Sequence, residues 1–197
     1  MRKYLIVPAA ALILAMSSSA LAQSKKCCTE SKLTDAACCG NSYFDGVSFK
    51  SVKLHKALTG KTVKASSIKC DSCKKALKGD GTCDNCKLNF ADGKSYASKV
   101  AYTLSKGKAV DTSTIECEGC QKAAKNDQGR CESCDLGWVG NKVFKDKKSY
   151  KAATEARVIL AKAVETSKKC EACAVAMVTD GTCDSCKVSF KDGKKTG

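Results

Sequence analysis

The sequence has little of the material from which most proteins build a hydrophobic core. Beyond residue 22, Leu, Ile, Val and Phe together supply 28 of 175 residues, and the only proline, Pro8, lies before that point. A chain so poor in large aliphatic side chains, with a high net charge, seldom folds by burial alone. Small domains with too little core are usually held by disulfides or metal ions, and all 16 cysteines lie beyond residue 22. We therefore expect the cysteines to be the main cross-links of the fold.

Histidine is almost absent as well, since His55 is the only one. One histidine cannot supply a repeated Cys/His metal site, and we expect His55 to be an ordinary surface or half-buried residue. Covalent haem attachment needs Cys-x-x-Cys-His, and no Cys-x-x-Cys pair here is followed by histidine. The sequence also lacks a Gly-x-Ser-x-Gly nucleophile turn, a phosphate loop and a dinucleotide-binding glycine pattern. These absences favour a protein that is not an enzyme and binds no haem.

Residues 1–22 have the three-part plan of a secretory signal peptide. A short basic start, "MRK", precedes the apolar run "YLIVPAAALILAM" and a small-residue tail that ends at Ala22. The apolar run is too short to span a bilayer comfortably, and no later segment of the sequence is suited to it. We expect cleavage after Ala22 and a secreted or periplasmic protein that begins at Gln23, with no transmembrane segment in the mature chain.

The chain is basic, with 35 Lys and Arg residues against 20 acids, and a net charge of +13 remains once Arg2 and Lys3 leave with the signal. Only two arginines follow the signal, Arg130 and Arg157. Proteins that read nucleic acids favour arginine and interleaved aromatic residues, so we expect no specific nucleic-acid binding. The charge favours loose attraction to an anionic cell-surface component or protein, and a solvated surface is the simplest interpretation.

Twelve of the cysteines form three near-copies of one four-cysteine module. The copies are "CDSCKKALKGDGTCDNC", "CEGCQKAAKNDQGRCESC" and "CEACAVAMVTDGTCDSC", which we call modules 70–86, 117–134 and 170–186. Each module has two Cys-x-x-Cys pairs, with nine or ten residues between them. The N-terminal counterpart, "CCTESKLTDAACC", has two pairs of adjacent cysteines instead, so it departs from the pattern of the other three.

The modules belong to a longer internal repeat. Residues 90–117 match the residues 47 positions earlier without a gap; the next copy matches at an offset of 54, which places Tyr150 on Tyr96 and makes "LGWVGN" an insertion after Cys134. We expect Trp138, within this insertion, to fill a local gap in the packing. The chain then divides into a signal peptide (1–22), an atypical N-terminal repeat (23–65), two full repeats (66–111 and 112–165) and a truncated C-terminal repeat (166–197).

The segments between modules have turn and helix patterns. Asp-Gly is a turn signal, and it precedes apolar residues near the helical period. The expected helical stripes consist of Tyr96, Val100 and Leu104 in one repeat and Tyr150, Ala153, Val158, Ala161 and Val164 in the next. The first of these helices should stop at Gly107. The expected fold is small, α+β and cysteine-stapled: a tandem array of four-cysteine knuckle modules joined by short amphipathic helices.

Four sulfurs at this spacing suit an all-cysteine zinc site. Two Cys-x-x-Cys turns brought face to face present four thiolates tetrahedrally, about 2.3 Å from zinc. Gly81, Gly129 and Gly181 stand two residues before the second pair, which suits a close approach of the backbone to metal or sulfur. The arrangement resembles zinc ribbons and rubredoxin-like knuckles, although the Cys-Pro-x-Cys-Gly form is absent. The resemblance implies closed structural zinc sites with these ligands: Cys70, Cys73, Cys83, Cys86, Cys117, Cys120, Cys131, Cys134, Cys170, Cys173, Cys183 and Cys186.

Disulfide bonds are the main alternative for the same cysteines, because oxidising compartments outside the cytosol favour them. A bridge over about 15 residues contributes roughly 3 kcal/mol in the chain-entropy model. Adjacent cysteines cannot form the two-residue knuckle, so the N-terminal set suits zinc less well and favours disulfides. That set consists of Cys27, Cys28, Cys38 and Cys39. An iron–sulfur cluster, which also accepts four cysteines, is a minor alternative.

Four functions are compatible with these patterns. The leading hypothesis is an exported, non-enzymatic repeat protein with structural zinc modules, acting as a binding or structural element of the periplasm or cell surface. A disulfide-stapled secreted protein of the same architecture is the second. A protein that buffers or sequesters soft metal ions is the third. A thiol–disulfide oxidoreductase is the fourth, kept open by lysines beside the pairs (Lys69, Lys74, Lys75 and Lys87), although no thioredoxin-like alternation of strands and helices is present.

Overall fold

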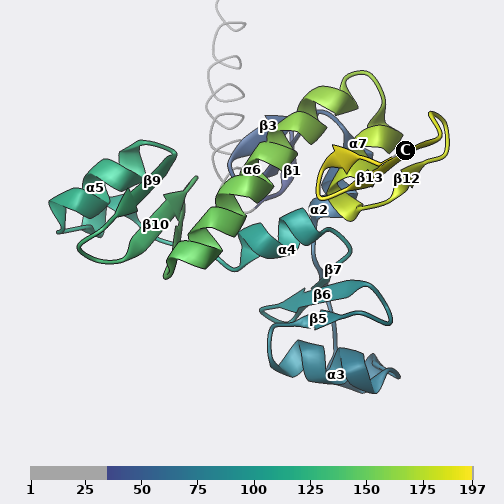
Figure 1. The fold of residues 1–197 in the computed structure, drawn as a ribbon, viewed down its shortest axis with the longest axis horizontal. Helices are drawn as coiled ribbons and strands as arrows, with labels where there is room; N and C mark the ends of the chain where they lie inside the picture. The colour runs from purple at the N-terminus through teal and green to yellow at the C-terminus, as the bar shows by residue number, and fades with distance from the viewer. Residues whose placement is uncertain (1–34, 197) are drawn as a thin grey trace, which may run out of the picture.

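The computed structural model describes residues 35–196, so the predicted signal peptide, Cys27 and Cys28 lie outside the described residues. Within this range the chain forms six α-helices, two short 3₁₀ helices (Ala65–Ser67 and Thr112–Thr114) and small antiparallel sheets. The predicted α+β class is therefore confirmed. The elements are arranged as a central body with two outlying lobes, one around α3 (Asp71–Lys78) and one around α5 (Glu118–Lys125) (Figure 1).

Four hairpins of one plan make the sheets, and each has three antiparallel strands, the last two of which are joined by a tight turn. In chain order they are β1 (Ala37–Cys38), β2 (Asn41–Phe44) and β3 (Val47–Phe49); β5 (Thr82–Cys83), β6 (Leu88–Ala91) and β7 (Lys94–Tyr96); β9 (Gln128–Cys131), β10 (Leu136–Val139) and β11 (Lys142–Phe144); β12 (Thr182–Cys183), β13 (Val188–Lys191) and β14 (Lys194–Lys195). Two further strands extend the middle hairpins: β4 (Lys61–Thr62) pairs with β7, and β8 (Lys108–Ala109) pairs with β11.

The predicted Asp-Gly turns are confirmed in three of the hairpins. Both residues of each turn have positive φ, which is the requirement of the two-residue turns that suit the twist of a hairpin. A second aspartate, ten or twelve residues earlier, accepts a hydrogen bond from the backbone N–H of the turn aspartate. The pairs are Asp35 with Asp45 (2.6 Å), Asp80 with Asp92 (3.0 Å) and Asp180 with Asp192 (2.7 Å). Because the same hydrogen bond recurs, these three hairpins are structural repeats of one another.

The predicted insertion of "LGWVGN" is wrong. These residues form β10 and the following turn, and β10 pairs with β11 in the register that β6 has with β7. Trp138 therefore occupies the position of Phe90, and Phe144 occupies that of Tyr96. The additional residues lie in the next helix, because α6 (Lys147–Ser167) has 21 residues whereas α4 (Lys99–Ser105) has seven.

The helices that follow the first three hairpins each begin at a side-chain cap. The capping residues are Ser51 before α2 (Val52–Leu58), Ser98 before α4 and Asp146 before α6. The side-chain oxygen of each accepts a hydrogen bond from the backbone N–H of the residue three positions later. In α4, Val100 and Leu104 are buried as predicted, and the helix ends shortly before Gly107.

The buried face of α6 agrees with the predicted one only in part: Ala153 is buried and Tyr150 and Val164 are partly buried against the core, but two predicted residues are exposed. Ala153, Ala156, Leu160 and Ala163 face the core, whereas Val158 is 45% exposed and Ala161 is exposed. A helix rich in alanine and valine has two overlapping apolar stripes, so its period alone does not decide which stripe is buried.

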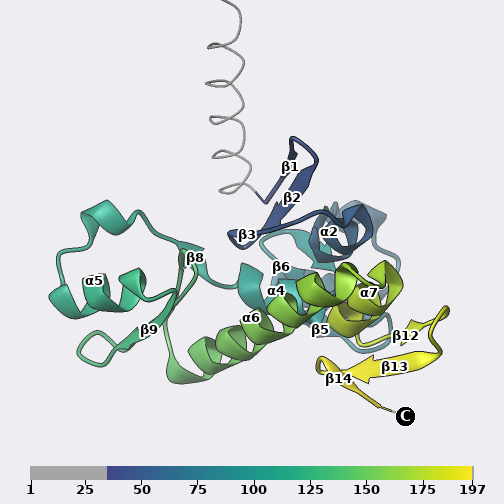
Figure 2. The same cartoon turned by 90° about the horizontal axis from the view of Figure 1, so that it is seen from above.

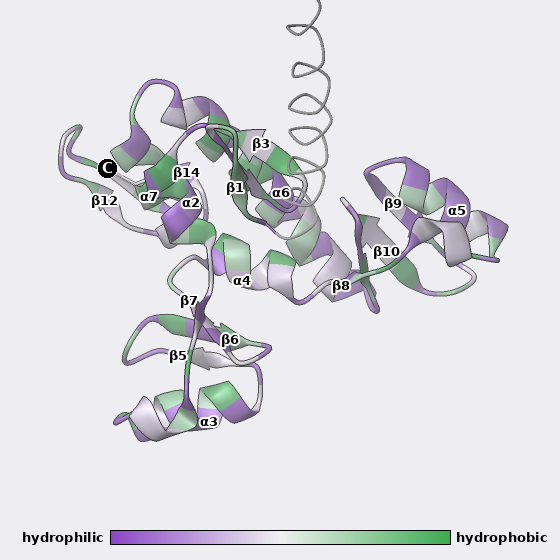
Figure 3. Cartoon of the chain, turned by 180° about the vertical axis from the view of Figure 1, so that it is seen from behind, coloured by the Kyte–Doolittle hydropathy of each residue, from purple (hydrophilic) through white to green (hydrophobic). Residues whose placement is uncertain are grey.

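A shared core in the central body joins units that are far apart in the sequence. It contains buried residues of α2, α4, α6 and α7 (Glu171–Thr179), among them Leu54, Leu104, Leu160 and Val178. Helix α7 packs against both α6 and α2, so the last unit contacts the first (Figures 1 and 2). Figure 3 shows hydrophobic residues gathered around this meeting point. The predicted tandem array, in which each unit contacts only its neighbours, is therefore wrong for the central body, where the first and last units pack together.

A buried cluster of charges attaches the third hairpin to the first. The side chain of Asp45 is fully buried, with Lys142 Nζ 3.0 Å from its Oδ1 and Arg157 Nη1 2.5 Å from its Oδ2. Arg157 also donates to the carbonyl oxygen of Asp45. A buried carboxylate paired with Lys142 of the third hairpin and Arg157 of α6 holds the two hairpins together, because separating them would leave the Asp45 carboxylate buried without a cation.

Each outlying lobe has a very small core of its own. The lobe around α3 buries Cys73, Ala76, Cys83 and Phe90. The equivalent residues of the lobe around α5 are Cys120, Ala123, Cys131 and Trp138. Trp138 is 2% exposed, which confirms that it fills a gap in the packing. Half of each small core is cysteine, so the order of both lobes depends on what the sulfurs do.

Candidate metal centre

The first Cys-x-x-Cys pair of each module lies at the start of a helix. Cys70, Cys117 and Cys170 are the residues at which α3, α5 and α7 begin, and the second cysteine of each pair is three residues further, in the first turn. Residues three apart lie on the same side of a helix, so both sulfurs face the same way. The second cysteine is buried in all three modules, at Cys73, Cys120 and Cys173.

The second pair lies where a short strand turns back. Strands β5, β9 and β12 end at Cys83, Cys131 and Cys183, and four residues connect each to the next strand. The last residue of this connection has positive φ, a conformation that favours glycine. Here it is Lys87, Asp135 or Lys187, with φ of 51°, 52° and 55°. The zinc-ribbon pattern has glycine at this position, so the backbone keeps the shape of that knuckle with a different residue.

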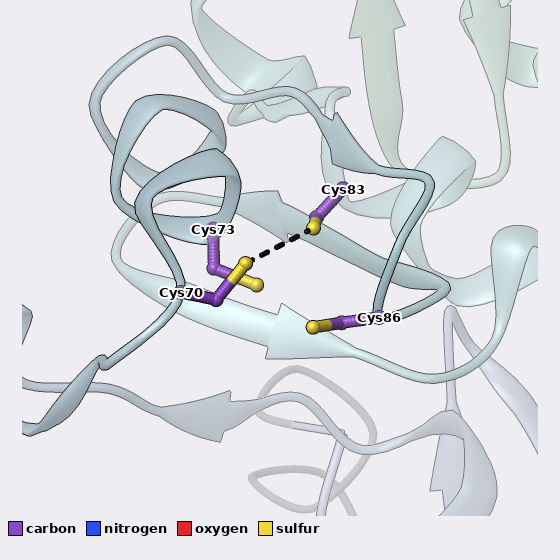
Figure 4. A group of neighbouring side chains, drawn as sticks. All are labelled: Cys70, Cys73, Cys83 and Cys86. Atoms are coloured by element: carbon purple, nitrogen blue, oxygen red, sulfur yellow. Dashed lines mark hydrogen bonds between the residues drawn. The ribbon is translucent and has the colours of Figure 1, made fainter.

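The second turn brings its sulfurs to the first, and all twelve predicted ligands gather in three groups of four. Within each group every Sγ lies within 4.8 Å of the others. Figure 4 shows the four cysteines of module 70–86 directed at one point from the helix and the turn. The spacing alone predicted these groups, and the structure confirms that they form. That they hold a metal stays a prediction.

The distances between sulfurs match those of a tetrahedral metal site and are longer than a disulfide bond. The Sγ atoms of Cys70 and Cys83 are 3.9 Å apart, and those of Cys117 and Cys134 are 3.6 Å apart. Four thiolates about 2.3 Å from a tetrahedral zinc ion stand about 3.8 Å from one another. A disulfide would place two sulfurs about 2.05 Å apart. The twelve cysteines are free thiols in this geometry, and their sulfurs fit a tetrahedral ion.

Backbone N–H groups point at the first sulfur of each pair. In module 170–186 the N–H of Cys173 donates to Cys170 Sγ, and that of Cys186 donates to Cys183 Sγ, each at 3.4 Å. A hydrogen bond to the charged form of a group stabilises that form. These donors therefore favour thiolates, which are the state in which cysteine binds metal.

The titration behaviour of the thiols follows the same pattern. The N–H of Cys73 lowers the pKa of the Cys70 thiol to about 7, and the N–H of Cys186 lowers the pKa of Cys183 to about 7. In module 117–134 the hydroxyl of Ser133 lowers the pKa of Cys131 to about 6. Burial raises the pKa of the Cys120 thiol to about 12. Each group thus has one thiol whose pKa is lowered and one whose pKa is raised, the latter at Cys73, Cys120 and Cys173.

Access to the sulfurs is graded in the same way in all three groups. The two middle cysteines are buried, the first is half-buried, and the last is exposed. The exposed ones are Cys86, Cys134 and Cys186. Four thiolate ligands fill the coordination of a tetrahedral ion and leave no open position for water. Such a centre suits a structural role.

The predicted role of the glycines before the second pair is corrected by the structure. A Cβ on Gly129 would lie 2.6 Å from the carbonyl oxygen of Ala123, which belongs to the preceding helix. Gly81 and Gly181 donate their N–H to the carbonyls of Ala76 and Ala176, each at 2.9 Å. Gly129 therefore allows the strand to approach the end of the helix, whereas a Cβ at Gly81 would have no neighbour closer than 3.7 Å and one at Gly181 none closer than 3.4 Å.

The N-terminal counterpart is built differently. Strands β1 and β2 are joined by only two residues, Cys39 and Gly40, both with positive φ, where the other units have the four-residue knuckle. Cys38 is disulfide-bonded, and it occupies the position of Cys83 in the hairpin. The preference of this set for disulfides over zinc stays a prediction, because Cys27 and Cys28 lie outside the described residues.

His55 lies apart from the three sulfur groups, as expected. Its Nε2 is 2.9 Å from the carbonyl oxygen of Asp35, and its ring centroid is 6.4 Å from that of Phe49. These contacts give it a local packing role in the first unit.

Within residues 35–196, no helix combines the length and the apolar character needed to cross a bilayer. Comparisons with protein families, with curated proteins and with solved structures give no match to this chain.

Proposed function

We propose that this chain is an exported, non-enzymatic repeat protein whose three four-cysteine groups are structural zinc sites. In this proposal it serves as a binding or structural element of the periplasm or cell surface, where its basic surface favours anionic partners. The twelve module cysteines hold the metal and have no catalytic role. Zinc binding of roughly 10–16 kcal/mol per site, as in zinc-finger peptides, would supply the folding free energy that the small lobe cores lack.

The observation that carries the proposal is the spacing of the sulfurs. Distances of 3.8 Å from Cys170 Sγ to both Cys183 Sγ and Cys186 Sγ equal the edge of a tetrathiolate tetrahedron. The same distances recur in modules whose other residues differ, and the N–H donors favour the ionised ligands. Zinc is favoured over other ions because four thiolates in a closed tetrahedral set are its usual structural site.

Metal analysis together with a count of free thiols tests the proposal on protein purified from its native compartment. We expect about three tightly bound zinc ions per chain, and release of the module thiols when a chelator removes them. Absence of metal and of free thiols in the modules would support the disulfide-stapled alternative instead. Mass spectrometry of the mature N-terminus tests export, with Gln23 as the expected first residue.

Metal buffering is the second candidate, because Cys86, Cys134 and Cys186 are exposed and offer each centre to an incoming thiol. Variable loading, above one ion per module or including copper, would favour this candidate over a structural role. The non-enzymatic character is tested separately by insulin reduction. A rate near that of a known oxidoreductase would revive the thiol–disulfide enzyme.

A further inference from the structure

The three sulfur groups have equal ligands but unequal surroundings. Module 70–86 is flanked by Lys69 and Lys87, and module 170–186 by Lys169 and Lys187. The equivalent positions of module 117–134 hold Glu116 and Asp135. All six side chains are exposed, and each is directly next to a ligand in the sequence.

The difference persists when the other nearby charges are included. Each module also has one acidic residue inside each Cys-x-x-Cys pair. Arg130, which is specific to module 117–134, forms ion pairs with Glu132 and Asp135, and its positive charge offsets one of the negative charges of this module. Residues within and immediately beside the pairs then sum to +1 in module 70–86, −3 in module 117–134 and 0 in module 170–186. Over the whole span from one flanking residue to the other, which in module 117–134 adds Lys125, Asp127 and the Lys122 that pairs with Glu118, the sums are +2, −2 and −1, so module 117–134 stays the most negative.

These charges act on the finished centre. Binding a divalent ion to four cysteines releases protons and leaves a centre with a charge of −2. Neighbouring lysines stabilise that centre, whereas neighbouring carboxylates oppose it. Because the side chains are exposed, water and salt screen the effect, and a difference of about threefold to tenfold in metal affinity is the expected size.

We propose that module 117–134 is the labile metal site of this chain, the one that fills last and empties first. This inference rests on the proposed function, because it requires that the groups bind metal. The flanking residues Glu116 and Asp135 lower the metal affinity of this module relative to the other two, whose four cysteine ligands are the same. At intermediate zinc levels the chain then carries two zinc ions, in modules 70–86 and 170–186, and module 117–134 in the lobe around α5 is empty.

The chain has a natural reporter for this site. Trp138 is the only tryptophan, and it is buried in the small core of the lobe together with Cys120 and Cys131. Because two of the four buried residues of that core are ligands, loss of the metal should expose the indole to water. Trp138 fluorescence therefore follows module 117–134, without interference from the other two sites.

The test uses the full reduced chain in a series of zinc buffers at neutral pH. Alkylation followed by peptide mass spectrometry gives the protection of each module's cysteines, and Trp138 fluorescence is recorded in parallel. We expect module 117–134 to reach half-protection at about threefold to tenfold higher free zinc than the other two. Simultaneous filling, or earlier filling of this module, would overturn the inference. If zinc protects no module at any level, the proposed function itself fails.

Charge substitutions provide the matched controls. Glu116→Lys with Asp135→Lys gives module 117–134 the flanks of its neighbours, and the fluorescence midpoint should move to their zinc range. Lysine at the position of Asp135 is compatible with its positive φ, because Lys87 and Lys187 adopt the same conformation. The converse change, Lys69→Glu with Lys87→Asp, should weaken module 70–86 and leave the other two unchanged. Unmoved midpoints in both variants would contradict a role for the flanking charges.

Discussion

Modules 70–86 and 170–186 have the same arrangement of sulfurs in different surroundings. In the first, Cys73 and Cys83 pack with two other residues in an outlying lobe. In the second, Cys173 and Cys183 belong to the shared core. The sequence explains the difference, because α7 has Ala174, Met177 and Val178 buried where α3 is mostly charged and exposed. The same four-cysteine group can thus belong to a local lobe or to the core of the whole body, depending on the helix that carries it.

The largest expected effect is that of removing a ligand in the shared core. Cys173→Ser should abolish the cooperative unfolding of the central body, because a structural zinc site supplies about 10–16 kcal/mol and a whole domain is stable by about 5–15 kcal/mol. Thermal unfolding followed by circular dichroism measures this. Ser185→Ala, an exposed change between the second pair of cysteines, is the control and should leave the transition within about 0.5 kcal/mol.

The same substitution in the outlying module should have a local effect. Cys73→Ser is expected to remove hydrogen-exchange protection from residues 61–90 and to leave α6 and α7 protected, because the buried residues of that range form a cluster separate from the shared core, to which Ala91 and Tyr96 belong. Hydrogen exchange with peptide resolution makes the comparison. Loss of protection in α7 after this change would show that the lobes and the body are one cooperative unit.

A cavity in the shared core should weaken the body and spare the lobes. Leu160→Ala removes a fully buried side chain from α6 and should cost about 2–5 kcal/mol. Val158→Ala, on the 45% exposed side of the same helix, should change the free energy of unfolding by less than about 0.5 kcal/mol. Chemical denaturation of both variants is the measurement. Equal losses in the free energy of unfolding for the two variants would contradict the assignment of Leu160 to the buried face of α6 and of Val158 to the exposed one.

The smallest of these effects concerns one hydrogen bond between α4 and α7. Ser98 Oγ accepts the N–H of Ala101 at the helix start and donates to the carbonyl oxygen of Val178 at 2.8 Å. Ser98→Ala should cost about 1 kcal/mol for the lost cap and about 1 kcal/mol more for the buried carbonyl left unpaired. Ser51→Ala removes the equivalent cap of α2 and serves as the matched comparison. The same denaturation experiment should rank Ser98→Ala as the more costly, and the reverse order would contradict the bridging role.

Much of the site could be predicted from the sequence because its geometry is local. Two residues between cysteines fix each half of the group, and Asp-Gly fixes the turn that follows. The positions of Cys70, Cys73, Cys83 and Cys86 therefore required no knowledge of distant packing. The conformation of Lys87 gave no signal, because a lysine with positive φ has nothing in the sequence to mark it.

The shared core was not predictable in the same way, because it depends on contacts between distant segments. Small residues such as Ala153, Ala156 and Ala174 form much of it, and alanine is common on exposed helices too. The repeat pattern also suggested separate units, since nothing in the period shows that α2 lies against α7. The offset of the third repeat was misplaced because the added residues lengthen a helix that has no sharp boundary in its sequence.

The central claim is that grouped sulfurs binding metal keep this chain ordered, and one measurement tests it most directly. The reduced protein is melted with its metal in place and again after chelation, with zinc counted in both samples. We expect about three zinc ions per chain for the three sulfur groups, and loss of the cooperative transition once they are removed. A reduced, metal-free protein that unfolds cooperatively at an unchanged midpoint would contradict the claim.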